Sequence, residues 1–394
     1  MTGNRARFTI AAVAVSVIAA AAAAAVIGWR AFGDDGSSKG TATRSTAPAS
    51  APATSAACNP ESVIAGWPLE KRLAQLVMVG VDPRSGNEAQ GLVASFGVGG
   101  VFIGGDASGI FNDGSLTRLA TASNIPPLVA VDDEGGRVQR IDQLAGQLPS
   151  ARTMARTMTP EQVRETAAQR GRALRDAGVT MDLAPVLDVS NQSNGQVIGD
   201  RSFADDPAVV SEYADAFAAG LRDAGVVPVF KHFPGHGHAT GDSHRQAAVT
   251  PPLAVLEASD LVPYQRLLNT SPVGVMVGHL DVPGLTSPGE PASVSPSAVN
   301  DLLRTRLGYQ GFVMTDDLSE MEAIKQSFGV PEAAVRALHA GNDMALLVDS
   351  SDFPGVLGHL VDAATTHRLD DAQINRSVAR VLAVKGIDPC RPGA

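Results

Sequence analysis

Eight short apolar runs restrict the fold of this chain more than any other feature of its sequence. They lie at residues 73–81, 98–103, 128–131, 179–187, 226–230, 273–277, 312–314 and 344–348. Most are rich in valine and do not alternate with polar residues, which is typical of strands that are covered on both faces. Eight such strands fit an α/β fold, a single-domain (β/α)8 TIM-type barrel, better than an open doubly wound sheet.

The connections between the runs are partly repeated. Residues 174–179 read Leu-Arg-Asp-Ala-Gly-Val, and residues 221–226 have the same six letters. Each copy joins the end of a predicted helix to the next strand, with glycine where the helix ends. Three predicted helices begin with a capping side chain followed by proline, at 159–160, 206–207 and 295–296. The repetition favours consecutive βα units. Gly99, Gly104 and Gly105 lack the spacing of a dinucleotide-binding loop.

The N-terminal segment predicts export. Residues 8–28 form an apolar stretch long enough to span a bilayer, with Arg5 and Arg7 before it and Asp34 and Asp35 after it. We therefore expect residues 1–33 to be a cytoplasmic stub and a signal anchor, with a cleaved signal peptide as the alternative. Residues 34–59 predict a disordered spacer of Ala, Ser, Thr and Pro, 60–390 the barrel and 391–394 a short tail. The expected location is extracytoplasmic, either anchored to the membrane or secreted.

The two cysteines, Cys58 and Cys390, stand near the two ends of the predicted barrel. The first and last elements of a barrel are neighbours, so in an oxidising compartment these residues could form a disulfide. A lipid-modified Cys58 is the alternative, although it lies far beyond the apolar stretch. The formal net charge of −10 and the lack of a long basic run argue against nucleic acid as a partner. We expect a monomer.

Polar residues follow the apolar runs, where strands of a barrel end at a common mouth. They include Asp132, Asp133 and Glu134 after the third run, Asp188 after the fourth, Lys231 and His232 after the fifth, His279 and Asp281 after the sixth, and Asp316 and Asp317 after the seventh. One such acid would be an ordinary helix cap. Repetition at so many strand ends predicts a functional mouth instead.

The stretch 231–244 holds four histidines and an aspartate, which suggests a metal site or an acid/base site. The helical spacing of metal ligands is missing, and three glycines give a loop poorly suited to a preformed metal cage. Asp242 and His244 are one residue apart, so their side chains can meet, and a carboxylate favours the protonated imidazole. His236 and His238 fit loop packing at least as well as catalysis. Acid/base chemistry beside a further carboxylate is what cleavage of an acetal requires. Spacing alone leaves Asp132, Asp133, Asp316 and Asp317 open as that carboxylate.

Four motifs together resemble the bacterial β-N-acetylglucosaminidases, or β-hexosaminidases, of glycoside hydrolase family 3. They are Val-Asp-Asp-Glu-Gly-Gly-Arg-Val-Gln-Arg at 131–140, Gly-Asp-Arg-Ser-Phe at 199–203, Lys-His-Phe-Pro-Gly-His-Gly at 231–237 with Asp-Ser-His at 242–244, and Thr-Asp-Asp-Leu at 315–318. They occur in the family's order, and the resemblance covers residues 61–388. The 231–244 block is the most specific. It is similar to the single-domain subgroup that has an Asp-His acid/base dyad.

The resemblance implies retaining hydrolysis of terminal β-linked N-acetylglucosamine, with peptidoglycan fragments or other N-acetylglucosamine-containing glycans as substrates. It implies that Asp316 is the nucleophile and that His244, oriented by Asp242, is the acid and then the base. It places Asp132, Arg140, Arg201, Lys231 and His232 on the sugar hydroxyls, and it implies no metal and no organic cofactor.

The sequence also departs from the family pattern. Asp133 stands where the family usually has Gln, residues 238–241 replace the usual start of that loop, and 319–321 looks one residue longer than usual. These differences leave the loop details and the substrate preference open. An N-acetylglucosaminide phosphorylase, a β-glucosidase and a non-catalytic sugar-binding protein are the alternatives.

Overall fold

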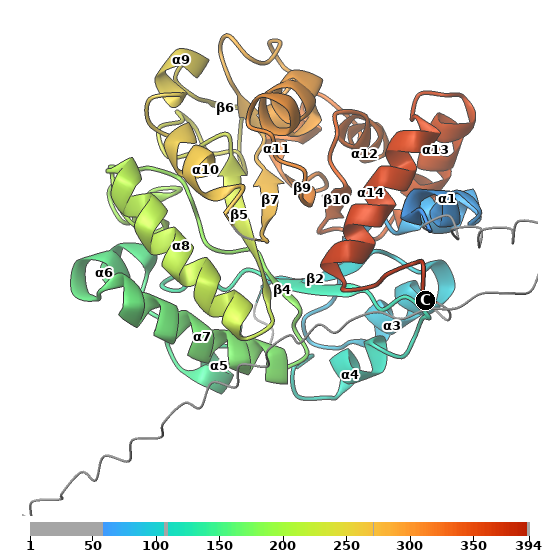
Figure 1. The fold of residues 1–394 in the computed structure, drawn as a ribbon, viewed down its shortest axis with the longest axis horizontal. Helices are drawn as coiled ribbons and strands as arrows, with labels where there is room; N and C mark the ends of the chain where they lie inside the picture. Colours follow the sequence, from blue (N-terminus) through green and yellow to red (C-terminus); the bar gives the residue numbers. More distant parts are fainter. Residues whose placement is uncertain (1–57, 106–108, 271, 392–394) are drawn as a thin grey trace, which may run out of the picture. The chain divides into compact units, whose positions relative to one another are not determined.

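The computed structural model describes residues 58–105, 109–270 and 272–391, which form a closed barrel of parallel strands surrounded by helices (Figure 1). The strand order around the barrel is β1-β10-β9-β7-β5-β4-β3-β2. The strands are β1 (Val77–Gly80), β2 (Gly100–Ile103), β3 (Leu128–Val131), β4 (Met181–Asp182), β5 (Val227–Phe233), β7 (Gly274–Val277), β9 (Val313–Asp317) and β10 (Met344–Leu347). The predicted eight-stranded α/β barrel is therefore confirmed.

The strands agree with the apolar runs in position but differ in extent. The first run is helical at its start, because Leu73 and Ala74 belong to α2 (Leu69–Ala74), which packs the same kind of apolar side chain against the barrel. β5 and β9 continue beyond their runs into the polar residues. β6 (Ala248–Val249) and β8 (Leu280–Asp281) form a separate two-stranded sheet.

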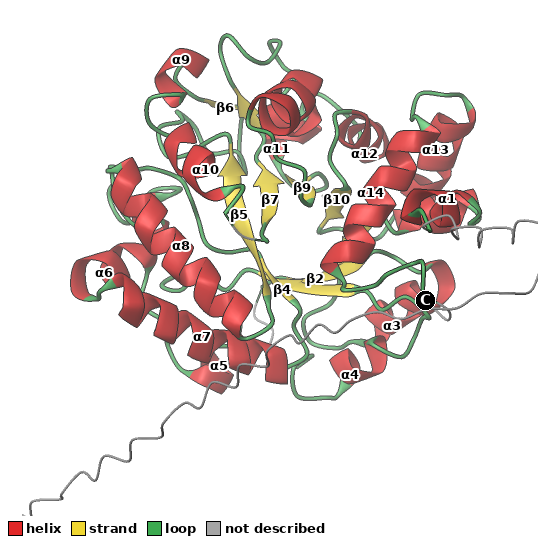
Figure 2. Cartoon of the chain, viewed as in Figure 1, coloured by secondary structure: helices red, strands yellow, loops and turns green. Residues whose placement is uncertain are grey.

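Helices cover the outside of the barrel, as Figure 2 shows. The longer ones are α3 (Asn87–Phe96), α7 (Pro160–Asp176), α8 (Pro207–Asp223), α12 (Val330–His339), α13 (Phe353–Thr365), α14 (Asp371–Val384) and a π-helix (Ser297–Arg306). The short ones are α1 (Pro60–Ala65), α4 (Ser115–Leu119), α5 (Asp142–Ala145), α6 (Ala151–Thr157), α9 (Leu253–Leu256), α10 (Leu261–Leu267), α11 (Glu322–Lys325) and the 3₁₀ turns Gly199–Arg201 and Ala292–Val294.

The local signals explain most of these helix ends. Thr159 begins α7 with a capping box to Gln162, and Asp206 accepts from the N–H of Ala208 at the start of α8. At the third predicted cap, Pro296 is helical as expected, but the helix has no side-chain cap.

The repeated six-residue joint has a physical reason. Gly178 and Gly225 have φ angles of 94° and 75°, in the left-handed region that side chains with a Cβ rarely adopt. Each glycine turns the chain from a helix on the outside into the next barrel strand. Gly178 also lies against Leu116, where an added Cβ would come within 2.9 Å of the leucine side chain.

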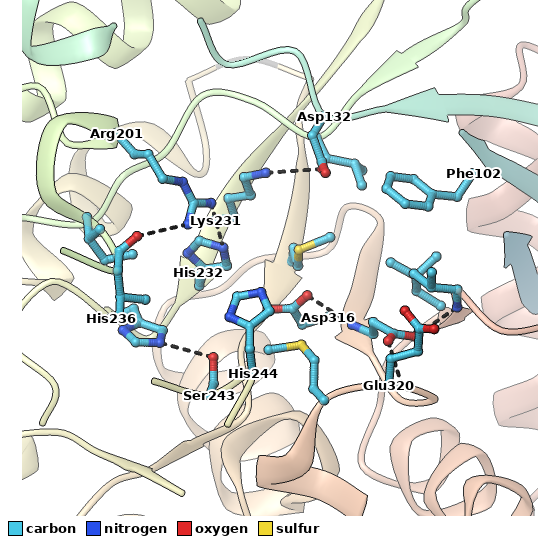
Figure 3. A pocket seen from close by; sticks show the side chains of 18 residues that line it. Phe102, Asp132, Arg201, Lys231, His232, His236, Ser243, His244, Asp316 and Glu320 are labelled. Carbon is cyan, nitrogen blue, oxygen red and sulfur yellow. Dashed lines mark hydrogen bonds and ion pairs between the residues drawn. The ribbon is translucent and has the colours of Figure 1, made fainter. Parts of the chain in front are cut away.

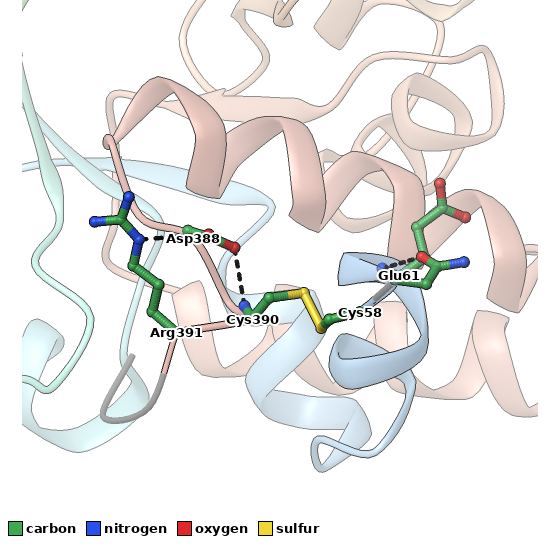
Figure 4. The surroundings of a disulfide bond; sticks show 6 residues. Cys58, Glu61, Asp388, Cys390 and Arg391 are labelled. Atoms are coloured by element: carbon green, nitrogen blue, oxygen red, sulfur yellow. Dashed lines mark hydrogen bonds and ion pairs between the residues drawn. A yellow bond between two sulfur atoms is a disulfide. The ribbon is translucent and has the colours of Figure 1, made fainter. Parts of the chain in front are cut away.

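A disulfide joins the two ends of the barrel domain. Cys58 and Cys390 are bonded, with their Cα atoms 5.9 Å apart, and Figure 4 shows the bond beside the first and last helices. α1 and α14 pack against each other next to it, so the chain ends are held together by both apolar contact and a covalent bond.

The expected signal anchor, 1–33, and most of the expected spacer, 34–59, lie outside the described residues, as do the last three residues of the tail. Within the described part of the chain, the helices are all too short or too polar to span a bilayer.

Candidate active site

A cavity of about 240 Å³ opens at the carboxyl ends of the barrel strands. Figure 3 shows it with the side chains that surround it. Its lining is made of Phe102, Asp132, Leu183, Val197, Ile198, Arg201, Lys231, His232, His236, Ser243, His244, Met276, Asp316, Asp317, Glu320, Met321, Leu346 and Val348. Six of the eight predicted site residues are in this set. Asp242 and Arg140 are not, and each lies behind a residue that is.

Asp316 lies near the end of β9, and its carboxylate accepts a hydrogen bond of 2.9 Å from the backbone N–H of Asp317. Burial alone would raise its pKa. The positive potential of His232 and His279, the Asp317 N–H and His244 outweigh burial and lower the pKa of Asp316 to about 2. The carboxylate is therefore ionised at neutral pH, as a nucleophile must be.

The neighbouring carboxylate, Asp317, has a different surrounding. Its Oδ1 accepts from the hydroxyl of Ser319 at 2.6 Å and from the N–H of Val348 at 2.8 Å, and its Oδ2 accepts from the N–H of Glu320 at 2.8 Å. These bonds hold the loop after β9 against the end of β10. Asp317 is thus committed to supporting the loop, although it also touches the cavity.

Buried His279 fixes the backbone just after the two aspartates. Its Nε2 lies 2.6 Å from the carbonyl oxygen of Asp317, and its Nδ1 lies 2.6 Å from the hydroxyl of Ser293. The imidazole is held at both nitrogens. It therefore supports Asp316 through the main chain rather than by entering the cavity.

The His244 imidazole is joined to Asp242, with Nδ1 and Oδ1 2.8 Å apart. The same oxygen accepts the backbone N–H of His244 at 3.1 Å. Partial burial tends to raise the pKa of Asp242, but the hydrogen bonds from His244 lower it. An ionised Asp242 holds Nδ1 as a donor and leaves Nε2 to exchange a proton. The His244 side chain is 63% exposed and faces the same cavity as Asp316 (Figure 3).

The loop that carries His244 is anchored on both sides. The N–H of Ala323 donates to the carbonyl of Ser243 at 3.1 Å, and that of Glu322 lies 3.5 Å from the carbonyl of His244. On the other side, the Ser243 hydroxyl lies 3.2 Å from Nε2 of His236. The start of α11 and the end of β5 therefore both position the loop.

The other two histidines of the loop have separate roles. His236 lines the cavity and is 3% exposed, and its Nδ1 has no partner among the described residues. His238 instead bonds Asp260 at 2.9 Å, away from the cavity lining. In the described part of the chain, His, Cys, Asp and Glu side chains do not gather in any group of three that could hold a metal ion.

A buried charge cluster forms the inner wall of the cavity. Arg201 binds Glu134 through two bonds of 2.8 Å, and Nζ of Lys231 lies 2.6 Å from the same carboxylate. Asp132 pairs with Lys231 at 3.4 Å and with Arg140 at 3.2 Å. Burial would raise the pKa of Glu134, but the two cations lower it well below its usual range. The wall thus presents charged donors and one carboxylate to a ligand.

Both Lys231 and His232 reach the cavity although they are consecutive strand residues. Side chains of a regular strand alternate between two faces. The register of β5 against β7 shifts between Phe230 and Phe233, and such an irregularity re-aims side chains. Nδ1 of His232 is 2.7 Å from Oδ2 of buried Asp188, which fixes the ring.

Asp133, the departure from the family pattern, is a structural residue. Arg170 on α7 binds its two oxygens at 2.5 and 3.0 Å, and the N–H of Arg140 donates to it at 2.7 Å. Both charged side chains are buried. Asp133 therefore positions the turn that carries Arg140, and its carboxylate does not reach the cavity.

Sequence reasoning did not find the specific roles of three residues that support or line the cavity: Glu134, Asp188 and His236. Glu134 and Asp188 follow apolar runs just as Asp132 and Asp316 do. The signal that separates them is burial against a particular cation or imidazole, which depends on the tertiary structure.

Comparison with known proteins identifies the family. Residues 68–384 match the model of the glycosyl hydrolase family 3 N-terminal domain. The chain is 47% identical over 382 residues to the β-hexosaminidase LpqI of Mycobacterium tuberculosis, covering 95% of this chain and 97% of that protein. A solved family 3 glycosyl hydrolase from Mycobacterium smegmatis is 50% identical, with a TM-score of 0.79 and coverage of 83% and 98%. A family 3 β-N-acetylglucosaminidase from a Paenibacillus species is 32% identical, with a TM-score of 0.76 and coverage of 81% and 62%. This chain belongs to glycosyl hydrolase family 3.

Proposed function

We propose that the protein is an exo-acting β-N-acetylglucosaminidase that removes terminal β-linked N-acetylglucosamine with retention of configuration. Membership of family 3 makes the chain a glycoside hydrolase, and its mycobacterial relative, which matches it over 97% of that relative's length, is a β-hexosaminidase. The observation that carries the mechanism is one cavity bounded by an ionised carboxylate, Asp316, and a carboxylate-bound imidazole, His244.

In the first step, Asp316 attacks the anomeric carbon and the glycosidic bond breaks. The proton on Nε2 of His244 passes to the departing oxygen, so the leaving group departs as a neutral alcohol. The charge on Asp242 stabilises the imidazolium before transfer. The products of this step are a glycosyl ester on Asp316 and a neutral His244.

In the second step, neutral His244 takes a proton from water while the water oxygen attacks the same anomeric carbon. The ester bond breaks, Asp316 regains its charge and His244 regains its proton. Two displacements at one carbon give net retention.

The inner wall accounts for recognition of a terminal sugar. Asp132 accepts from sugar hydroxyls, while Lys231, Arg201 and His232 supply donors for sugar oxygens. Arg140 acts through Asp132, which it holds at 3.2 Å. Behind this wall the Glu134 carboxylate is buried between Arg201 and Lys231, so the sugar meets a packed charge cluster at the inner end of the cavity. This supports exo action.

We also propose that the enzyme acts outside the cytoplasm, on peptidoglycan fragments or related glycans, with residues 60–390 as the catalytic domain. The apolar stretch at 8–28 and the bond between Cys58 and Cys390 support export, since disulfides persist in oxidising compartments. We further propose that the enzyme acts as a monomer, because Asp316, His244 and Asp242 of a single chain suffice for both steps.

The nucleophile is tested with Asp316→Ala and 4-nitrophenyl N-acetyl-β-glucosaminide. Loss of the carboxylate should reduce kcat by about 10⁴-fold or more while the protein stays folded. NMR of the first product should show the β-anomer. Unchanged turnover would refute the assignment, and an initial α-anomer would refute retention.

The acid is tested with His244→Ala on two substrates. Nitrophenol leaves without much help, whereas a sugar leaving group needs a proton, so chitobiose hydrolysis should fall about 10²- to 10⁴-fold and nitrophenol release less. Arg245→Ala, at an exposed neighbouring position, is the matched control. Equal losses on both substrates would contradict the acid role. Assays with and without phosphate, and with the matching glucoside, distinguish hydrolysis from phosphorolysis and from glucosidase activity.

A further inference from the structure

We propose that Glu320 selects the leaving group: the enzyme favours neutral or amine-bearing aglycones and disfavours those with a carboxylate beside the scissile oxygen. The aglycone is the part of the substrate that departs when the bond to N-acetylglucosamine is cleaved. This inference rests on the proposed function, and it assigns a substrate class to the outer part of the same site.

Glu320 lies in the loop after β9, four residues beyond Asp316, and it lines the cavity (Figure 3). Its backbone N–H donates to the carboxylate of Asp317 at 2.8 Å, which fixes the main chain. Its side chain is exposed, and its carboxylate has no hydrogen bond or ion pair with any described residue. A fixed main chain therefore holds an uncompensated acidic group at the cavity.

The other carboxylates of the cavity lining are already engaged. Asp132 pairs with Lys231 and Arg140, and Asp317 accepts three hydrogen bonds from its own loop and one from Val348. Asp316 is the proposed nucleophile, held by its neighbour's N–H. Glu320 is thus the remaining carboxylate whose charge acts on whatever enters the outer cavity.

The cations near this rim do not neutralise Glu320. Lys325, on α11, pairs with Glu322 at 3.4 Å, and Arg245 lies 3.7 Å from Asp242. Both cationic side chains are engaged with other acids. Among the described residues, no cation is therefore paired with the Glu320 carboxylate.

The leaving group must pass this part of the cavity. His244 donates to the glycosidic oxygen, so the aglycone lies on the His244 side of the anomeric carbon. The loop of His244 rests directly on the chain after Glu320, because Ala323 donates to Ser243 and Glu322 approaches the carbonyl of His244. Glu320 and Met321, both in the lining, precede these contacts by one or two residues. The aglycone therefore leaves between His244 and Glu320.

Glu320 would repel a carboxylate on the aglycone. The repulsion would weaken substrate binding and raise the free energy of the transition state. Two like charges a few ångströms apart repel each other in water, and they repel more strongly at a partly desolvated site. We expect the effect on kcat/KM to be about three- to tenfold, because the rim is open to solvent and solvent screens the two charges. The relevant aglycones include sugars with a lactyl ether on the carbon next to the linkage oxygen: the free acid should react more slowly than its amide.

The test uses two aryl N-acetyl-β-glucosaminides that differ in one group next to the scissile oxygen, 2-carboxy-4-nitrophenyl and 2-carbamoyl-4-nitrophenyl. The ratio of their kcat/KM values is compared between the wild-type protein and Glu320→Gln, so intrinsic differences in leaving ability cancel. We expect the substitution to raise the relative rate of the carboxylate substrate by about three- to tenfold. Adding about 0.5 M salt shortens the range of charge interactions, so it should reduce the preference of the wild-type protein for the carbamoyl substrate.

Glu322→Gln is the matched control, because Glu322 is exposed, two residues away, paired with Lys325 and absent from the lining. It should leave the ratio unchanged. An unchanged ratio in Glu320→Gln, or an equal change in both variants, would overturn the inference. Cleavage of the carbamoyl substrate by the wild-type protein tests the proposed function separately, since that activity does not depend on Glu320.

Discussion

Replacing Glu134 with Gln should both destabilise the fold and impair the site, because Glu134 is the common partner of two buried cations. Its carboxylate is 4% exposed and binds Arg201 at 2.8 Å and Lys231 at 2.6 Å. Glutamine has the same shape but no charge, and its amide nitrogen turns a donor toward one of the two cations. The substitution therefore isolates the contribution of the charge.

The size of the effect follows from the burial of the partners. Removing one member of a buried ion pair typically costs about 3–5 kcal/mol, since the other charge is left uncompensated. Asp132 still lies 3.4 Å from Lys231, and the Gln oxygen can still accept from Arg201, so we expect about 3 kcal/mol. With an unfolding entropy of about 2.1 cal/mol/K per residue over roughly 330 residues, this lowers the Tm by about 4 °C.

The assay combines urea unfolding with steady-state kinetics on a neutral N-acetylglucosaminide. The unfolding free energy should fall at pH 7, and kcat/KM should fall about 10- to 100-fold because Arg201 and Lys231 lose their fixed positions. The pKa of Glu134 is lowered in the folded protein, so its contribution is complete above its ordinary value of 4.5 and is lost as the pH falls below it. The difference in unfolding free energy between Glu134→Gln and the wild-type protein should therefore decrease only at acidic pH.

The control for Glu134 is Asp223→Asn, which breaks the exposed pair of Asp223 with Arg164. Exposed pairs contribute little to stability, so this variant should unfold like the wild-type protein. If Glu134→Gln were equally stable and equally active, the buried cluster would not be what positions the two cations, and the reasoning would fail.

Two further predictions concern stability. Burial and the nearby carboxylate of Asp133 raise the pKa of Asp182. Ionised Asp182 therefore opposes folding increasingly as the pH rises above the ordinary pKa of 3.8. Asp182→Asn should raise the unfolding free energy at pH 7 and not at pH 3, which urea unfolding at both pH values checks. Replacing both Cys58 and Cys390 by Ser opens a link between positions 332 residues apart and should cost about 2–5 kcal/mol; a wild-type Tm that does not change on reduction would contradict it.

The barrel could be predicted from the sequence because its signal is repeated. Each βα unit contributes an apolar run and a connection, so an error at one strand changes little. The first run shows the limit: residues 73 and 74 are apolar because α2 packs on the barrel, and an apolar run alone does not distinguish a buried helix end from a buried strand. The run at 179–187 shows a second limit, because only Met181–Asp182 is a strand and the buried apolar residues after it lie in a loop.

The candidate site was predictable in its location but not in its supporting contacts. A polar residue after a barrel strand points toward the mouth, which applies equally to Asp132, Asp133, Glu134 and Asp188. The structure separates them by their partners: Asp133 pairs with a helix arginine, whereas Glu134 and Asp188 hold residues that line the cavity. Those partners, including Lys231 for Glu134, lie 37 to 97 positions away in the chain, a separation that local patterns do not encode.

The pair Asp316 and Asp317 shows why the tertiary structure is needed to separate a reactive carboxylate from a supporting one. Both residues end β9, both touch the cavity, and they are chemically identical. Asp317 is saturated by hydrogen bonds from Ser319, Glu320 and Val348, so attack on a sugar would require breaking them. Asp316 accepts one backbone hydrogen bond and is kept ionised mainly by imidazoles at a distance. A carboxylate that is charged but not saturated with hydrogen bonds is free to form a new bond. Asp316 is kept charged by His232 on β5, His279 just after β7 and His244 on its loop, and all three lie far from it in the sequence.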